Sequence, residues 1–442
     1  MNGASPERIE ETLKELTEGI GERLAGSSAE LQAVRYIQRQ CAHAGALVAV
    51  EEFPVRYRCV QGEHVEVCIG GVWRRFACSL FSNTPGTEGE TIEAPLVFFE
   101  TPAESRRADL SHLRGKAVVH LGCHIESRDY YRRLIEAEPA FLLFVDIRYP
   151  GCVPLADGMF PAYTDSVGVV PTVNVAYMDA WQWHIEAATR ARLCVKGGMQ
   201  ASVSHNVVVE IPGSEPEAGI IVVGGHHDTQ ADSVGADDNA TGTAAVVELA
   251  RLLTQAAGTK SNRRTIRLVS FGAEEQLSVG SAVHVRRRRR ELHERGVFML
   301  NFDSFGSGLG WTEMVANGPP EMAEYLLEFF EQRDLYMRPS ADVMPYTDHF
   351  PFVAAGVPGV SIIRYNCTVG RFFHHRPDDD ISRLSLPLLA RIIDCANRLL
   401  VELANADPFP FPGTIPAQVT EKATSYWEDL FNGWNPSTMG AD

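Results

Sequence analysis

The second half of the chain alternates short apolar segments with longer amphipathic ones, and this rhythm restricts the fold more than any other feature. Strands that alternate with helices form a mostly parallel sheet with helices on both faces. The sequence therefore predicts an α/β fold, in which a mixed, mostly parallel sheet is sandwiched by helices. The predicted strands are 206–211, 219–224, 265–271, 297–302 and 357–364, and the predicted helices are 241–257, 278–290, 321–333 and 386–405.

The rest of the chain has a different pattern of apolar residues. Two amphipathic helical patterns open it, the second of them over 28–44. Short apolar runs then predict a small β-rich unit, and the chain closes with a Pro-rich segment followed by aromatic residues, which we expect to dock on the body or on a neighbour. We therefore predict a discontinuous main domain that comprises 1–58 and 200–405. An inserted β-rich domain covers 59–199, and a C-terminal extension covers 406–442.

The charge balance argues against two classes of partner. The chain has 40 Lys and Arg against 57 Asp and Glu, a formal net charge of −17, so its field repels phosphate backbones and anionic lipid. No segment approaches the roughly 18 to 20 apolar residues of a membrane span, and the polar N-terminus does not resemble a secretory signal. The nine cysteines form no CxxC pair, which indicates reduced thiols. We expect a cytoplasmic protein without nucleic-acid or membrane partners.

Imidazoles and carboxylates follow four of the predicted strands. Because the carboxyl ends of parallel strands meet at one edge of a sheet, we expect these side chains to lie close together. Their nitrogen and oxygen atoms suit zinc, and more loosely manganese or cobalt, and a shared carboxylate can hold two ions about 3.5 to 4 Å apart. Divalent cations would also remove the repulsion between so many acids. The residues are His226, His227, Asp228, Asp237, Asp238, Glu274, Glu275, Asp303, His374 and His375.

Six motifs in chain order resemble the co-catalytic zinc exopeptidases of peptidase family M28. They are HHD, GADDNATG, AEEQLSVGS, NFD, TDHFPF with GVP, and FHHRPDDD. The resemblance covers about 1–58 and 200–405, and it implies a zinc-exopeptidase fold of the phosphorylase/hydrolase-like type. The inserted segment, with LRGKAVVHLG, FLLFVDI and VPTVNVAYMDAW, is similar to the protease-associated domain that many members carry at this position.

The resemblance implies a centre that binds two zinc ions. Glu274 corresponds to the general base, and Asp228, two residues beyond His226, to a residue that accepts the other N–H of that histidine. Family members often have a cis peptide bond after the bridging aspartate, so we predict one between Asp238 and Asn239. The metal ligands carried over are His226 and Asp303 for the first ion, Glu275 and His375 for the second, and Asp238 for both.

The function that the resemblance implies is metal-dependent hydrolysis of short peptides, and an aminopeptidase is the first choice. A water shared by two zinc ions would lose its proton to Glu274 and attack the carbonyl, and Glu274 would pass the proton to the departing amine. Manganese and cobalt are candidate substitutes for zinc. The expected partner is a peptide substrate, and the inserted domain and aromatic tail are candidate surfaces for a homo-oligomer.

Two positions differ from the family's pattern. His374 stands where relatives often carry tyrosine, and His227 stands where an aromatic residue is common. His374 and Tyr346 are both candidates for stabilising the oxyanion. Arg364, near the final ligand, is a candidate for binding a substrate carboxylate, although an exposed arginine beside acids is the simpler interpretation.

Other patterns have structural interpretations. The five consecutive arginines of 286–290 continue a predicted helix in an acidic chain, so we interpret them as a solvated face rather than as an import signal. Roles in packing or in supporting the pocket are expected for His120, Cys123, His124, Asp348 and His349.

Three other functions remain open at this stage. The same fold could use one zinc ion for aminoacyl cyclisation, as glutaminyl cyclases do, or it could be a carboxypeptidase-like hydrolase. A third reading is a receptor-like homologue whose site no longer performs catalysis. The complete set of ligands, together with Glu274, favours an enzyme over this last reading.

Overall fold

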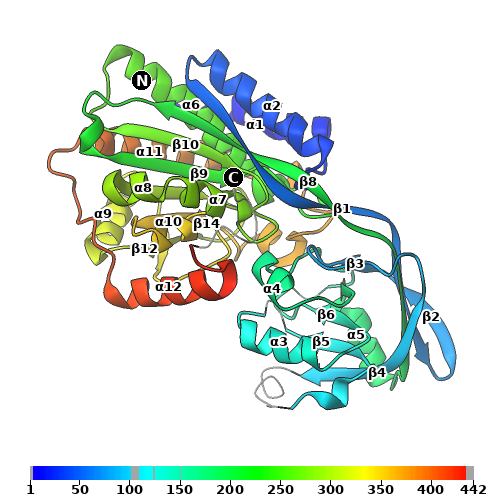
Figure 1. Cartoon of the computed structure of the whole chain (residues 1–442). Coiled ribbons are helices and arrows are strands. Elements are labelled where there is room, and N and C mark those ends of the chain that lie inside the picture. Colours follow the sequence, from blue (N-terminus) through cyan, green and yellow to red (C-terminus); the bar gives the residue numbers. More distant parts are fainter. Residues whose placement is uncertain (1–2, 101–108, 123–124, 150, 435–442) are drawn as a thin grey trace.

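The computed structural model describes residues 3–100, 109–122, 125–149 and 151–434, and the described strands join into one sheet of 14 strands. The main domain and the inserted domain occupy opposite ends of the molecule (Figure 1). The elements of the main domain and the C-terminal extension are α1 (Pro6–Lys14), α2 (Ser28–His43), β1 (Leu47–Ile69), β8 (Arg190–Ile211), β9 (Ile220–His226), α6 (Thr241–Thr259), β10 (Thr265–Phe271), α7 (Val279–Arg287), α8 (Arg289–Arg295), β11 (Gly296–Phe302), β12 (Thr312–Asn317), α9 (Pro320–Glu331), β13 (Met337–Ser340), α10 (Phe350–Ala354), β14 (Gly359–Ile363), α11 (Leu386–Asn405) and α12 (Ala417–Phe431). The elements of the inserted domain are β2 (Val72–Phe76), β3 (Cys78–Leu80), β4 (Ile92–Glu100), β5 (Ala117–Leu121), α3 (Arg128–Glu136), β6 (Phe141–Val145), α4 (Pro161–Ser166), β7 (Thr172–Val175) and α5 (Tyr177–Ile185).

Four neighbouring strands at the centre of the main domain run parallel. β14, β11, β9 and β10 lie side by side in that order, and each pairs in parallel with the next. β8 and β12 flank this group as antiparallel neighbours. The mixed, mostly parallel sheet confirms the predicted fold class. The edge strand β13 is short and largely exposed, so no apolar pattern predicts it.

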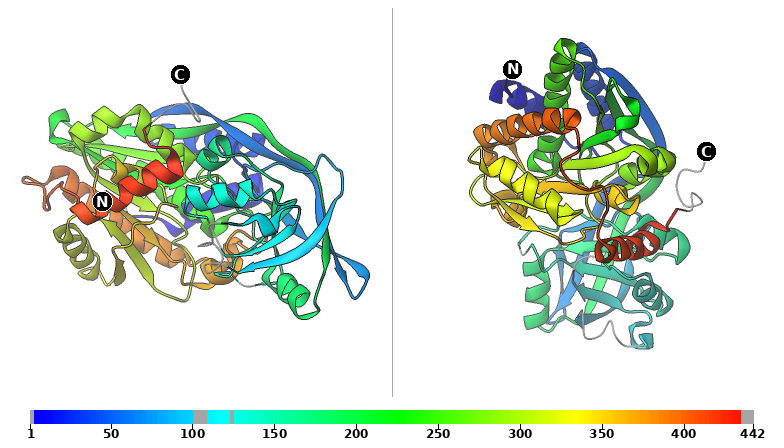
Figure 2. Two further views of the ribbon diagram at one scale, coloured as in Figure 1. Left: turned by 60° about the horizontal axis from the view of Figure 1, so that its bottom comes forward. Right: turned by 90° about the vertical axis from the view of Figure 1, so that its left-hand side faces the viewer.

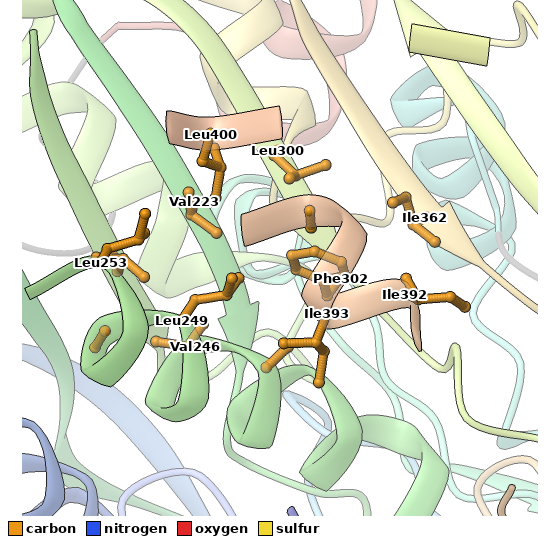
Figure 3. Close-up of a cluster of buried hydrophobic side chains, with 14 of the residues drawn as sticks. Val223, Val246, Leu249, Leu253, Leu300, Phe302, Ile362, Ile392, Ile393 and Leu400 are labelled. Atoms are coloured by element: carbon orange, nitrogen blue, oxygen red, sulfur yellow. The ribbon is translucent and has the colours of Figure 1, made fainter. Parts of the chain in front are cut away.

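The central strands are buried on both faces, which explains their continuous apolar sequences. Val223 of β9 and Leu300 of β11 face Leu249 of α6 and Leu400 of α11 (Figure 3). The next residues along each strand point the other way, and Val222 and Met299 pack with α7, α8 and α10. Successive side chains of a strand alternate between faces, so helices are needed on both sides. This arrangement fixes the register of each strand and therefore the position of its carboxyl end.

The inserted domain is joined to the main domain by a paired ladder of strands rather than by loose chain. β1 and β8 run antiparallel from the pair Leu47 and Glu210 to the pair Cys68 and Arg190, and both strands extend from one domain into the other (Figure 2). The predicted boundaries at 58/59 and 199/200 fall inside these strands, and the division into domains stays a prediction. Hydrogen bonds along the ladder restrain how the two units can move relative to each other.

The C-terminal extension forms α12, which lies where the two domains meet (Figures 1 and 2). It packs against α10 of the main domain and α4 of the inserted domain. On the inserted side, Tyr163 donates a hydrogen bond to Asp429 at 2.7 Å. On the main side, Arg286 donates one to the carbonyl of Phe431 at 2.6 Å. The extension therefore docks on the body, as predicted, and it contacts both domains.

The interpretation of 286–290 as a solvated face is wrong in part. The guanidinium of Arg286 lies 4.7 Å from the ring centre of Trp427, and that of Arg289 lies 4.0 Å from the ring centre of Trp434. These arginines hold the aromatic extension through cation–π contacts. The predicted helix 278–290 is also interrupted, since α7 ends at Arg287 and α8 begins at Arg289.

His120 packs inside the inserted domain, as expected. Its ring stacks on Phe144 with centroids 4.4 Å apart, and its Nε2 lies 2.7 Å from the hydroxyl of Tyr130. Cys123 and His124 lie outside the described residues.

Among the described helices, we find no span long and apolar enough for a membrane crossing.

Replacing Trp427 with alanine is expected to destabilise the protein by about 3 to 5 kcal/mol, because it empties a buried aromatic site. Trp427 is 1% exposed and stacks on Phe431. The measurement is the free energy of unfolding from urea titration. The control is Trp181→Ala, since Trp181 is 49% exposed and its loss should change stability by less than about 0.5 kcal/mol. Equal effects of the two substitutions would contradict the role given to α12.

Candidate active site

Candidate site residues lie at the carboxyl ends of the four parallel strands. His226 is the last residue of β9, and Asp303 directly follows β11. Glu274 and Glu275 come three and four residues after β10, and His375 lies in the loop after β14. The four strands are neighbours, so their carboxyl ends meet at one edge, where open α/β sheets place their ligands. The structure therefore brings together the residues that the sequence analysis selected.

Asp238 is the residue around which the site is organised. Its Oδ1 lies 3.2 Å from Nε2 of His226, while its Oδ2 lies 3.0 Å from Nδ1 of His374 and 3.3 Å from Nε2 of His375. The two oxygens of one carboxylate thus face two different sets of imidazoles. Asp379 holds this residue by accepting its backbone N–H at 3.1 Å. The peptide bond between Asp238 and Asn239 is cis, as predicted.

A close approach of backbones sets the position of the turn that carries Asp238. The turn precedes α6, and a Cβ atom built at Gly242 would lie 2.4 Å from the carbonyl oxygen of Phe302. Glycine is required there, because any larger residue would push α6 away from β11. Gly242, the last residue of the motif GADDNATG, therefore allows the helix, and with it Asp238, to lie against the end of β11.

Two groups of side chains have the chemistry and spacing of metal sites. In one, Nε2 of His226 lies 3.6 Å from Oδ1 of Asp303, and both approach Asp238. In the other, His374 and His375 approach Asp238, and Oε2 of Glu275 lies 3.0 Å from Nε2 of His375. Nitrogen and oxygen donors without thiolate suit zinc.

An unsatisfied atom shows that these donors fit a cation. Nε2 of His226 is buried and makes no hydrogen bond among the described residues, although carboxylate oxygens surround it. A buried polar atom without a partner costs free energy, and a bound ion would remove that cost. The donor set therefore fits zinc at both groups, with Asp238 common to them.

Glu274 lies beside the two groups without belonging to either. Its Oε1 accepts a hydrogen bond from Oγ of Ser278 at 2.9 Å, and its Oε2 lies 3.8 Å from Nε2 of His226. Ser278 thus fixes the orientation of the carboxylate, and one oxygen stays directed at the cluster. This geometry suits a general base, and the sequence analysis did not identify Ser278.

Asp228 has a different principal role from the predicted one. Its carboxylate accepts the backbone N–H groups of Glu274 and Glu275, at 3.0 and 3.2 Å. Nδ1 of His226 lies 3.3 Å from the backbone carbonyl of Asp228 and 3.5 Å from its carboxylate. Asp228 therefore positions both glutamates in addition to lying beside the histidine.

The inserted domain forms part of the site. Its loop after β6 supplies Arg148, Tyr149 and Asp157 to the lining of the pocket above the cluster. The same loop orients a predicted ligand, since Nδ1 of His375 lies 2.8 Å from the carbonyl oxygen of Ala156. No pattern in the sequence predicts these contacts, because they join segments far apart in the chain.

The candidates for substrate contacts differ in their positions. Tyr346 and His374 line the pocket. Tyr365, which the sequence analysis did not consider, also lines it and donates a hydrogen bond to Asp303 at 3.2 Å. The prediction for Arg364 is wrong in both of its forms, because this side chain is buried and donates to the carbonyl of Ser307 and the hydroxyl of Thr312. It supports the loop that carries Ser307 and does not line the described pocket.

Comparisons with known proteins show similarity to peptidases. Residues 206–400 match the model of peptidase family M28. The match spans the four parallel strands that carry the candidate site. Aminopeptidase YwaD of Bacillus subtilis is 25% identical over 435 residues, which cover 95% of this chain and 89% of that protein. Human carboxypeptidase Q is 25% identical over 395 residues, covering 86% and 82%.

A solved structure extends the likeness to nearly the whole fold. A zinc aminopeptidase from Bacillus subtilis superposes with a TM-score of 0.72 at 20% identity, and the match covers 93% of this chain and 99% of that one. This shows a common fold that includes the region of the inserted domain. The family match begins at residue 206, after that region, so a protease-associated domain over 59–199 stays a prediction.

Burial and mutual repulsion perturb the acids of the site. Burial raises the pKa of Glu274 well above its usual range, and the carboxylates of Asp348 and Asp303 raise it further. Burial also raises the pKa of Glu275 and of Asp348 to about 7. These acids therefore resist ionisation at neutral pH unless positive charge lies near them.

One buried arginine supplies fixed positive charge below the cluster. Arg23 is 0% exposed and donates to the carbonyl oxygens of His227 at 2.8 Å and of Gly235 at 3.2 Å. Burial lowers its pKa to about 10 against the opposing effect of Asp228 and other acids, so it remains charged at neutral pH. Arg23 thus joins the loop after β9 to the turn before α6. The sequence analysis assigned no role to Arg23.

Metal-free protein is expected to lose stability as the pH rises from about 5 to 8. Glu275, Asp348 and Asp379 have pKa values of about 7 in the folded protein, above those of the unfolded chain. A raised carboxylate pKa stabilises the fold at low pH, and this contribution is lost as the pH passes the folded-state value. The measurement is the midpoint of thermal unfolding after chelation, at several pH values. Added zinc should flatten this dependence, and a midpoint that rises with pH in the metal-free protein would contradict the prediction.

Proposed function

We propose that this protein is a zinc-dependent aminopeptidase that binds two metal ions and cleaves short peptides. The observation that carries the proposal is the placement of Asp238, whose two oxygens face separate donor groups. A bridging carboxylate of this kind is what a two-ion hydrolytic site requires. The match of residues 206–400 to family M28 and the similarity to aminopeptidase YwaD support the same function.

Zinc at this centre would supply positive charge that polarises the scissile carbonyl and makes a nearby water easier to deprotonate. The protein's own residues do the rest. Oε2 of Glu274 faces the cluster, so Glu274 takes the proton from the attacking water and returns it to the departing amine. Ser278 and Asp228 hold Glu274 in place for both transfers.

The charges of the pocket favour a substrate amine over a substrate carboxylate. Among the described lining residues, Arg148 is the one arginine or lysine, and its guanidinium is paired with Asp146 at 2.6 Å. Asp157 adds a carboxylate from the inserted domain. A protonated N-terminus would therefore be attracted, whereas a C-terminal carboxylate would have to disrupt the pair of Arg148 and Asp146.

A cytoplasmic location stays a prediction.

Blocked peptides distinguish the open alternatives. We expect hydrolysis of a dipeptide amide and of an aminoacyl p-nitroanilide, no hydrolysis of an N-acetylated dipeptide, and loss of activity on chelation with recovery on adding zinc. Cleavage of the N-acetylated dipeptide alone would indicate a carboxypeptidase. Ammonia release from peptides with N-terminal glutamine would indicate a cyclase. No turnover of any of these substrates would favour a receptor-like protein.

The substitution Glu274→Gln tests the general base. It should lower kcat by roughly 10²-fold or more, because the amide cannot accept the proton, while zinc content stays unchanged. Steady-state kinetics and elemental analysis of the same preparation measure the two quantities. Glu291→Gln is a matched control, since Glu291 lies on α8 and pairs with Arg267, before the amino end of β11. Near-normal turnover by Glu274→Gln would remove Glu274 from this role.

A further inference from the structure

Two adjacent imidazoles converge on a single carboxylate oxygen of the site. The rings of His374 and His375 are stacked, with centroids 3.7 Å apart and planes inclined by 23°. Nε2 of His375 lies 3.3 Å from Oδ2 of Asp238, and Nδ1 of His374 lies 3.0 Å from the same atom. The family resemblance accounts for the first of these contacts and not for the second.

Nδ1 of His374 has the same unsatisfied character as the nitrogen of a predicted ligand. This nitrogen is buried and meets the criteria of no hydrogen bond among the described residues, although Oδ2 of Asp238 lies 3.0 Å away. Nε2 of His226 behaves in the same way beside the other oxygen of Asp238. Two ligands of one zinc ion, each about 2.0 to 2.2 Å from it, lie about 3 to 3.5 Å apart without bonding to each other.

Neighbouring rings hold His374 in this orientation. Tyr149, from the inserted domain, lies with its ring centre 4.8 Å from that of His374. His375 stacks on the same ring, and Tyr365 meets it edge-on at 5.8 Å. The imidazole is thus enclosed by aromatic rings, which restrict its rotation. This restraint keeps Nδ1 of His374 directed at Asp238.

We propose that His374 is a metal ligand, which binds the second ion through Nδ1 together with His375, Glu275 and Asp238. This inference rests on the proposed function, since it adds a donor to the same two-ion centre. It makes the centre asymmetric, with one imidazole at the first ion and two at the second. It also replaces the role of oxyanion donor considered for His374 from the sequence.

The wild-type protein provides a direct test. X-ray absorption of the zinc-loaded enzyme counts imidazoles through their outer-shell scattering. We expect three imidazoles shared by two zinc ions, and a count of two would overturn the inference. This measurement needs no variant and therefore does not depend on whether a substituted protein folds.

Substitution of His374 provides an independent test. His374→Phe keeps an aromatic ring in the stack but removes the nitrogen. We expect it to weaken the binding of one of the two zinc ions by at least roughly 10-fold, with the other unchanged, as measured by titration against a chelator of known zinc affinity. His184→Phe is the matched control, because His184 also contacts an aromatic ring, Phe98, and lies on α5 outside the pocket. Circular dichroism confirms that both variants are folded.

The outcomes separate this inference from the proposed function. If His374→Phe binds two zinc ions as tightly as the wild type, the inference fails while the proposed function stands. If wild-type protein binds no zinc, the proposed function fails and takes the inference with it. Selective loss of one ion in His374→Phe, with the control unchanged, supports both.

Discussion

Buried carboxylates gather at the carboxyl edge of the parallel sheet, and the rest of the structure compensates for their repulsion. Asp238, Glu275 and Asp303 lie within contact distance of His226 or His375. Such a group is stable near neutral pH only when its protons are retained or positive charge is supplied. Arg23 supplies part of that charge from below. Zinc is the cation whose ligand preferences match the remaining donors.

The inserted domain contributes to the same centre, although it and the main domain occupy opposite ends of the molecule (Figure 1). Its carbonyl at Ala156 contacts a predicted ligand, His375, and its Tyr149 packs on His374. The long ladder of β1 and β8 and the helix α12 hold the two domains in fixed contact. The geometry of the metal centre therefore depends on how the domains are joined as well as on the sheet itself.

Much of the main domain could be predicted because local patterns determine it. The predicted strand 265–271 and helix 386–405 agree with β10 and α11 at every residue, since their apolar periods reflect burial. The polar edge strand β13 had no such period. The arginine run was misinterpreted because sequence cannot show that Trp427 and Trp434 would lie beside it. Arg364 was misinterpreted because closeness to a ligand in sequence did not reveal that its side chain is buried beneath the loop.

The sequence by itself determined the α/β fold class and the residue types of the site, because strand ends, turn glycines and ligand spacing are local properties of the chain. It also supported the prediction of a cis bond after Asp238. The tertiary structure decided which of these residues meet, as the two oxygens of Asp238 do with two separate donor groups. It also decided that His374 joins that cluster and that Ala156 contacts His375. Such contacts arise from the packing of segments distant in sequence, and no local pattern of residues specifies them.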